Sequence, residues 1–258
     1  MNCCCKEGEK IQVLDKGYIQ LIDYMGNDER IVDAARLCVG STKGSQQDER
    51  LINYLLKNGH TSPFEQVVFT FKIKAPIFVI RQWFRHRTAR INEVSGRYTE
   101  FNPEFYVPDV NNIRLQHQSN KQMSGDYADE KLSEQIVKEF KQEQKLLKDW
   151  YKKKLVISKE QARINLPLSL YSEFFWQMDL NNMFKFLKLR CDSHAQQEIR
   201  VYANIILDII RDIVPIAVSA FENHVLYSVT LSRDEIDELI HSKVELKEIL
   251  EQKGYQYE

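Results

Sequence analysis

The clearest hydropathy pattern in the chain is an alternation of apolar and polar positions between residues 66 and 75. The side chains at alternate positions are apolar and would share one face of a strand: Val67, Phe69, Phe71 and Ile73. A period of two predicts a strand with one buried face, which Pro76 ends. Partial alternation over 11–25, with a turn near Lys16 and Gly17, and the apolar run 169–178 predict the other strands.

Apolar residues at helical spacing alternate with these strands without a regular β-α order. They predict helices over 28–39, 47–58, 77–87, 128–155, 159–165, 180–191, 194–219 and 233–252. Pro215 lies inside one of them and predicts a break there. Neither GxGxxG nor GxxxxGK[ST] occurs. We therefore expect a single α+β domain with a mixed or antiparallel sheet and several long helices, outside the Rossmann and P-loop designs.

Composition restricts the classes of partner. The 258 residues are 43% hydrophobic, enough for a sizeable core, and no run approaches the roughly 20 apolar residues of a membrane span. The positive charges of Lys+Arg (36) and the negative charges of Asp+Glu (37) nearly cancel. A protein that coats nucleic acid is normally basic overall, so this function is disfavoured. Any site for an anion must be formed by a local cluster of positive side chains. The polar N-terminus predicts a cytoplasmic protein. Residues 1–9 are expected to form a reduced cysteine-containing tail, and no metal site is expected.

Arginine is concentrated in one segment that contains no lysine. Five of the fourteen arginines lie there: Arg81, Arg85, Arg87, Arg90 and Arg97. A guanidinium binds phosphate or carboxylate through two parallel hydrogen bonds, which lysine cannot do. Residues 95–97 add a hydroxyl, close-approaching N–H groups and a cation, a combination suited to phosphate. Because Trp83 and Phe84 are bulky, we expect several of these charges near the core, where each needs a partner.

Residue chemistry alone leaves other interpretations open. The segment is also compatible with a helix end carrying surface ion pairs, with a phosphate-ester enzyme that uses no flavin, and with a nucleic-acid-binding module that stacks bases on aromatic rings. Ser95 is a conceivable nucleophile, but no histidine lies at an evident base position beside it.

Spacing adds a resemblance to a known family. Residues 85–97 resemble the motif RHRxxSxNExSxR of the flavin-dependent thymidylate synthases, and seven of its eight fixed positions match. Arg90 departs, since it stands where the family usually has serine. The resemblance covers roughly residues 10–220 and includes the segments 60–65, 163–167 and 189–196. It implies a synthase domain over 10–225 and a helical extension over 226–258.

The resemblance implies roles in binding the nucleotide dUMP. The matching residues are Gln82, Arg85, Glu93, Ser95, Gly96, Arg97, Arg163 and Arg190. Arg163 is expected to join the site from a neighbouring subunit. Arg190 is the expected catalytic residue, because a fixed cation at the O2/N3 edge of uracil stabilises the developing anion.

The resemblance also implies that FAD carries the chemistry. The matching residues are Ser62, Glu65, Arg85, His86, Arg87, Glu93, Asp179, Asn181 and His194. Asp179, Asn181 and Lys185 depart from the family's usual side chains, so the detailed flavin contacts are expected to differ. The implied reaction methylates dUMP to dTMP, with methylenetetrahydrofolate as carbon donor and NADPH as reductant. The implied assembly is a homotetramer with shared active sites, without nucleic acid or membrane.

Overall fold

The structure, a computed structural model, describes residues 8–37, 46–119 and 124–241. Its centre is a five-stranded sheet in the order β1-β2-β3-β7-β4, and every neighbouring pair runs antiparallel. The strands are β1 (Lys10–Val13), β2 (Gly17–Met25), β3 (Val68–Pro76), β4 (Arg90–Glu93) and β7 (Tyr171–Asp179). The α+β class with an antiparallel sheet is therefore confirmed. The three adjacent cysteines, and the last predicted helix beyond residue 241, lie outside the described residues.

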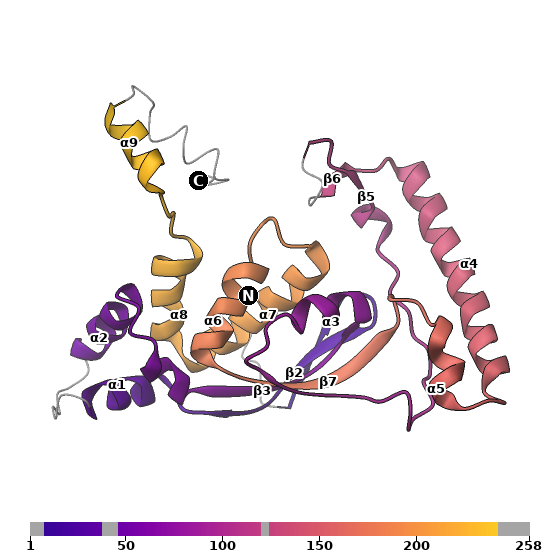
Figure 1. Cartoon of the computed structure of the whole chain (residues 1–258), viewed down its shortest axis with the longest axis horizontal. Coiled ribbons are helices and arrows are strands. Elements are labelled where there is room, and N and C mark those ends of the chain that lie inside the picture. The colour runs from indigo at the N-terminus through magenta and orange to yellow at the C-terminus, as the bar shows by residue number, and fades with distance from the viewer. Residues whose placement is uncertain (1–7, 38–45, 120–123, 242–258) are drawn as a thin grey trace.

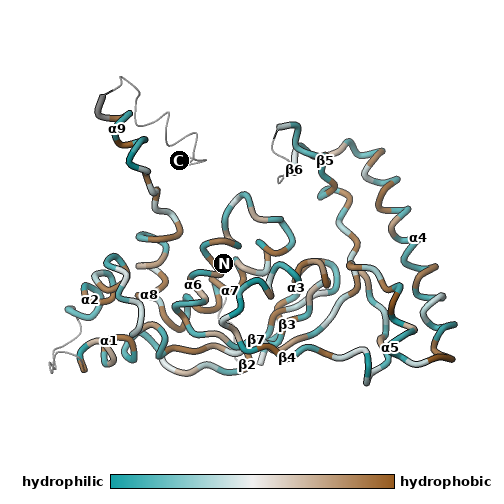
Figure 2. The backbone as a smooth tube through the Cα atoms, in the orientation of Figure 1, coloured by the Kyte–Doolittle hydropathy of each residue, from teal (hydrophilic) through white to brown (hydrophobic). Residues whose placement is uncertain are grey.

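One face of the sheet forms the core. The alternation predicted for β3 is confirmed, since the side chains of Phe69, Phe71 and Ile73 are fully buried. On the neighbouring strand Phe174, Trp176 and Met178 are equally buried and continue the same face. Brown, hydrophobic segments mark these strands in Figure 2.

Helices cover this buried face (Figure 1). They are α3 (Ile77–Trp83), α6 (Leu180–Arg190), α7 (Gln197–Ile213) and α8 (Pro215–Phe221), with α1 (Asp28–Leu37) and α2 (Gln46–Lys57) at one end. The indole of Trp83 joins the layers, because its ring lies 5.0 Å from that of Phe186 and 5.4 Å from that of Trp176.

The break predicted at Pro215 is confirmed. Helix α7 ends at Ile213, and α8 begins at the proline, which has no N–H to donate. The Asp28 carboxylate accepts hydrogen bonds from the backbone N–H groups of Ile216 (2.8 Å) and Ala217 (3.0 Å). It thereby caps the new helix from α1, and burial raises its pKa.

The long helix α4 (Glu130–Lys154) stands at the far end of the molecule and is followed by α5 (Lys159–Ala162). The segment 101–125, predicted as loop, also contains strand β5 (Arg114–Gln116), and β6 (Ser124–Tyr127) follows. These two strands form a small sheet of their own. Short turns of 3₁₀ or π helix complete the path: η1 (Ser62–Gln66), η2 (Val110–Asn112), η3 (Arg163–Asn165) and η4 (Glu222–Leu226).

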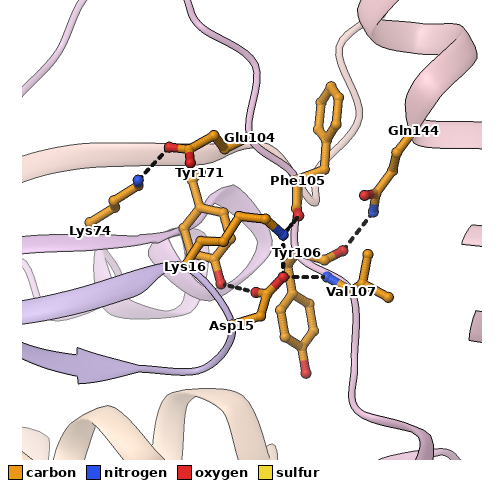
Figure 3. A network of polar contacts seen from close by, with 9 residues as sticks. All are labelled: Asp15, Lys16, Lys74, Glu104, Phe105, Tyr106, Val107, Gln144 and Tyr171. Atoms are coloured by element: carbon orange, nitrogen blue, oxygen red, sulfur yellow. Dashed lines mark hydrogen bonds and ion pairs between the residues drawn. The ribbon is translucent and has the colours of Figure 1, made fainter. Parts of the chain in front are cut away.

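A polar network ties this far end to the sheet (Figure 3). The Asp15 carboxylate accepts hydrogen bonds from the hydroxyl of Tyr171 (2.6 Å) and the N–H of Val107 (3.3 Å). Gln144 of α4 donates to the carbonyl of Tyr106 at 2.7 Å. The segment around Tyr106 and Val107 is thus anchored to the β1–β2 turn on one side and to α4 on the other.

Helix α9 (Arg233–His241) stands away from the sheet in Figure 1. No helix within the described ranges is long and apolar enough to cross a bilayer.

Candidate active site

The arginine-rich segment begins on α3, which ends at Trp83, four residues before the predicted end. The indole of Trp83 is fully buried, whereas the arginine side chains from 81 to 97 are all exposed. The expectation that several of these charges lie near the core is therefore wrong. For Arg81 the physical reason is that turning the apolar face of α3 into the core directs its polar face to solvent. The other arginines follow the end of this helix, and Arg90 lies on the exposed edge strand β4.

Arg190, the last residue of α6, is held by two acceptors. Its Nε donates to Nε2 of His86 and its Nη2 to the carbonyl of Gln82, each at 3.2 Å. The Gln82 side chain in turn donates to Oε1 of Gln196 at 2.5 Å. We term Gln82, His86, Arg190 and Gln196 the Arg190 cluster. It joins residues more than 100 positions apart in the sequence.

Electrostatics keeps His86 neutral. Burial, and then the positive charge of Arg190, lower its pKa to about 4. Because Nε2 accepts from Arg190, the ring proton belongs on Nδ1. The imidazole and the Phe186 ring pack edge to face, with centroids 4.9 Å apart. Burial also lowers the pKa of Arg190, but a guanidinium stays charged at neutral pH.

Residues 95–97, which we term the Gly96 loop, form a tight turn. The Ser95 carbonyl accepts from the N–H of Thr99 (3.1 Å), and the Ser95 hydroxyl accepts from the N–H of Arg97 (3.3 Å). Gly96 is buried, and a Cβ added to it would lie 2.2 Å from Cε2 of Phe101. Only glycine therefore fits this position.

Two cationic side chains border the Gly96 loop. A Cβ on Gly96 would also lie 2.9 Å from Cδ of Arg163, so Arg163 packs against the loop of its own chain. The turn after α5 folds Arg163 back onto this loop, and its expected contribution to a neighbouring subunit's site stays a prediction. Arg97 is more than half exposed and lies 3.3 Å from Oε2 of Glu160.

Glu93 lies on strand β4, in a stretch predicted as loop. Cross-strand pairing with β7 extends from Arg90 to Glu93 and turns that stretch into an edge strand. Oε1 of Glu93 accepts a hydrogen bond from the buried hydroxyl of Ser172 at 2.6 Å. Arg90, three residues earlier, faces the opposite side of the sheet, since strand side chains alternate.

The residues matched to FAD come together only in part. Asn181 is buried and donates to Oε1 of Glu65 at 3.0 Å, which brings the start of α6 beside η1, where Ser62 also lies. Asp179 caps α6 by accepting from the N–H of Asn182 at 2.9 Å. Arg85 and Arg87 are exposed, and neither side chain forms an ion pair or hydrogen bond within the described ranges.

His194 lies before α7, which begins at Gln197 rather than at the predicted 194. Its Nδ1 and its N–H each lie 2.8 Å from Oδ1 of Asp192. Its side chain borders a cavity of about 490 Å³ between α7, α4 and the β5–β6 hairpin. The lining also includes Arg114, Phe140 and Gln196, so the cavity adjoins the Arg190 cluster.

Three supporting residues were not predicted from the sequence. Phe101 covers Gly96, and its N–H donates to the hydroxyl of buried Tyr151 at 3.0 Å. Ser172 holds Glu93. No local pattern indicates the contacts of Tyr151 with Phe101 and of Ser172 with Glu93, because each joins residues from separate elements.

The fold is antiparallel α+β. Its site holds a fixed arginine beside a neutral histidine, and a glycine turn with two more arginines lies in the same chain. These features define a protein suited to a phosphorylated ligand. Comparison with known proteins gives this class a family. Residues 20–216 match the family model described as thymidylate synthase complementing protein.

Curated relatives agree with the family model. The chain is 49% identical over 233 residues to the flavin-dependent thymidylate synthase of Treponema denticola, covering 89% of this chain and 88% of that protein. It is 48% identical over 242 residues to that of Borreliella burgdorferi, covering 91% of each. The chain belongs to the flavin-dependent thymidylate synthase family.

A solved structure is also similar. The UMP/dUMP methylase PolB from Streptomyces cacaoi bound with 5-Br UMP matches with a TM-score of 0.76 and 29% sequence identity. The match covers 84% of this chain and 98% of that chain.

Proposed function

We propose that this chain methylates dUMP to dTMP, with methylenetetrahydrofolate as carbon donor, FAD as hydride carrier and NADPH as reductant. The observation that carries the proposal is the Arg190 cluster, which holds a partly buried cation beside a neutral histidine. The similar Streptomyces cacaoi methylase was also solved with 5-Br dUMP, which supports a pyrimidine nucleotide as substrate.

The Gly96 loop is proposed to hold the phosphate of dUMP. Its N–H groups, Arg97 and Arg163 offer donors and positive charge at one turn. Arg190 is proposed to lie at the O2/N3 edge of uracil, where its charge stabilises the anion that develops as the ring is activated. Gln82, Arg85, Glu93 and Ser95 complete the proposed dUMP set.

The residues present suit FAD. Exposed Arg85 and Arg87 offer forked donors to a pyrophosphate, and Ser62, Glu65 and Asn181 lie together as hydrogen-bonding groups. His86, Glu93, Asp179 and His194 complete the proposed set. Bound FAD, once reduced, would supply the hydride that completes the methyl group. The antiparallel sheet supports a cofactor site outside the Rossmann design.

A homotetramer with shared sites is part of the proposal. It rests on membership of the flavin-dependent thymidylate synthase family, because the resemblance to that family implies this assembly. A synthase domain over 10–225, an extension over 226–258 and a cytoplasmic location remain predictions.

The proposal is tested on the purified protein. We expect a yellow protein, or one that turns yellow with FAD, whose flavin absorbance shifts when dUMP is added. With NADPH and methylenetetrahydrofolate it should form dTMP. A protein that takes up no FAD and forms no dTMP would refute the proposal. Oligonucleotide binding that dUMP does not displace would favour a nucleic-acid module instead.

A further inference from the structure

Helix α4 carries a continuous row of lysines. Five of them follow one another at intervals of three and four residues, which places them on one face of the helix: Lys138, Lys141, Lys145, Lys148 and Lys152. We term them the lysine row. At about 1.5 Å of rise per residue, the row extends about 21 Å along α4. Like charges three or four residues apart destabilise a helix slightly, so the stability of α4 itself does not account for the pattern.

The positive charges of the lysine row are not neutralised by the described part of the chain. None of the five side chains forms an ion pair or a hydrogen bond there, and all but Lys148 are exposed. On α4 itself, Glu139 and Glu143 point roughly half a turn away from the row. Glu134 and Asp149 lie closer to its line, but they are fewer than the lysines. The row is therefore a strip of net positive charge.

A groove runs beside the lysine row. One cavity of about 560 Å³ lies between α4, the β1–β2 turn and η2, and a second of about 460 Å³ lies along α4. Both are lined by Lys141 and by the same two valines, so they form one groove, whose wall includes three lysines of the row. Two lining carboxylates, those of Asp15 and Asp109, already accept hydrogen bonds from the protein. Glu134 alone is left in this lining to balance three lysines.

The groove leads towards the candidate active site. Its first cavity shares Pro108 and Asn112 with the cavity of about 490 Å³ between α7, α4 and the β5–β6 hairpin. That cavity is bordered by Gln196, a member of the Arg190 cluster. A ligand bound at the Arg190 cluster can thus extend through adjoining cavities to the lysine row.

We propose that the lysine row binds the oligoglutamate tail of the folate co-substrate. Methylenetetrahydrofolate ends in a glutamate, and further glutamates joined through their γ-carboxyl groups each add one carboxylate. Such a tail is a single flexible chain of negative charges, and the row is a single file of positive ones. Lysine is a compact point charge on a flexible stem, which suits carboxylates whose positions vary. This inference rests on the proposed function and deepens it.

Nucleic acid fits the lysine row less well. Proteins that bind single strands combine a positive groove with aromatic rings on which the bases stack. The aromatic residues of this part of α4 lie on other faces of the helix, and one of them is buried: Phe140, Trp150 and Tyr151. The net charge of −1 also disfavours a polyanion as large as nucleic acid.

Steady-state kinetics with two folates tests the inference. The unmodified chain is assayed for dTMP formation with methylenetetrahydrofolate that carries either one glutamate or five. The pentaglutamate should lower the KM for folate about tenfold, because several exposed ion pairs form and each contributes a small part of the gain. The advantage of the pentaglutamate should shrink as added salt screens the charges.

A double variant locates the effect on the row. Lys141→Gln, Lys145→Gln removes two neighbouring charges and keeps good helix formers. It should raise the KM for the pentaglutamate about fivefold and leave kcat and the KM for the monoglutamate unchanged. Lys57→Gln, Lys153→Gln is the matched control, since it removes two exposed lysine charges that lie outside the row. Circular dichroism confirms folding of both variants.

The remaining outcomes separate this inference from the proposed function. Equal KM values for the two folates in the unmodified chain, or equal effects of the two double variants, would overturn the tail site while dTMP formation still supports the function. If neither folate yields dTMP, the function fails, and calorimetry with folic acid pentaglutamate and monoglutamate decides the tail site: tighter binding of the pentaglutamate that Lys141→Gln, Lys145→Gln abolishes supports it, and equal binding overturns it. An oligonucleotide that displaces the pentaglutamate and is weakened by the same variant would assign the row to nucleic acid instead.

Discussion

The two parts of the candidate site differ in how firmly the single chain holds them. In the Arg190 cluster the guanidinium donates to two acceptors, and the histidine beside it is half-buried and neutral. In the Gly96 loop Phe101 packs on Gly96, but Arg97 is 58% exposed and forms its ion pair with an exposed glutamate.

This difference separates two kinds of preparation for a ligand. The Arg190 cation is oriented before any ligand binds, so little reorganisation is needed when charge develops on the substrate. In the Gly96 loop the backbone N–H groups are already in position. The arginine side chains keep conformational freedom, which they would lose when an anion binds. Loss of an Arg190 contact should therefore affect turnover first, and changes in the loop should affect nucleotide affinity first.

The largest effect is expected from Arg190→Ala. Removing a cation aimed at developing charge should reduce kcat for dTMP formation by about 10²–10³-fold. FAD absorbance should be retained, because Arg190 is not in the proposed FAD set. Retained synthase activity would contradict the catalytic role, and loss of flavin together with activity would place Arg190 in the cofactor site instead.

Gly96→Ala should produce the next largest effect. Its Cβ would lie 2.2 Å from Cε2 of Phe101, so either the loop or the ring must move. We expect the KM for dUMP to rise roughly 30-fold, near 2 kcal/mol of lost binding, with a smaller change in kcat. Steady-state kinetics at saturating folate and NADPH measures the two separately.

The double variant Gly96→Ala, Phe101→Leu sharpens that test. Leucine lacks the ring atom that the new methyl group meets, so part of the lost affinity should return. Phe101→Leu alone is the matched control. If the double variant is as weak as Gly96→Ala, the loop is disturbed by something other than this contact.

Strands and helices were predictable where one face is buried. The period of two in β3 and the break at Pro215 are local consequences of burial and of proline geometry. The helix over 77–87 was extended too far because Arg85 keeps helical spacing, although the chain turns after Trp83. Strand β4 was missed because all four of its side chains are exposed, which removes the apolar alternation.

For the candidate site, the resemblance supplied a set of residues but not their arrangement. The family resemblance selected Glu93, Gly96 and Arg190, but it carries no information on which of them meet. The contact of Arg190 with His86 depends on tertiary packing, and that of Gly96 with Phe101 depends on the path of an irregular loop. Tyr151 lies on a helix whose pattern indicates only a charged surface, so nothing local links it to the loop.

A moderate effect is expected at His86. His86→Ala removes the acceptor of the Arg190 Nε–H, and a hydrogen bond to a charged group contributes about 1.5 kcal/mol, or about tenfold in the KM for dUMP. His86→Gln retains a side-chain acceptor and should recover part of the loss. If His86→Ala instead releases FAD and leaves dUMP affinity unchanged in the FAD-reconstituted enzyme, its contact with Arg190 is incidental.

The pH dependence of stability offers a second measurement on His86. Its folded-state pKa lies near 4, below its ordinary value of 6.5. Between these values the unfolded chain binds the proton and the folded chain does not, so stability is full above about pH 6.5 and is lost as pH falls towards 4. Solvent screening of the half-exposed ring should limit the loss to about 1 kcal/mol. In urea unfolding, His86→Gln should flatten this part of the pH profile.

The smallest effect is expected from Tyr151→Phe, which tests how far support for the Gly96 loop extends. The buried Tyr151 hydroxyl accepts the Phe101 N–H at 3.0 Å, and the substitution leaves that N–H without its acceptor while the aromatic ring stays packed. Such a loss costs about 1 kcal/mol, which should lower the urea midpoint slightly. If Phe101 transmits the change to Gly96, the KM for dUMP should also rise about two- to threefold, with kcat unchanged. A lower midpoint without any change in KM would show that Tyr151 stabilises α4 alone, and that the rigid part of the Gly96 loop ends at Phe101.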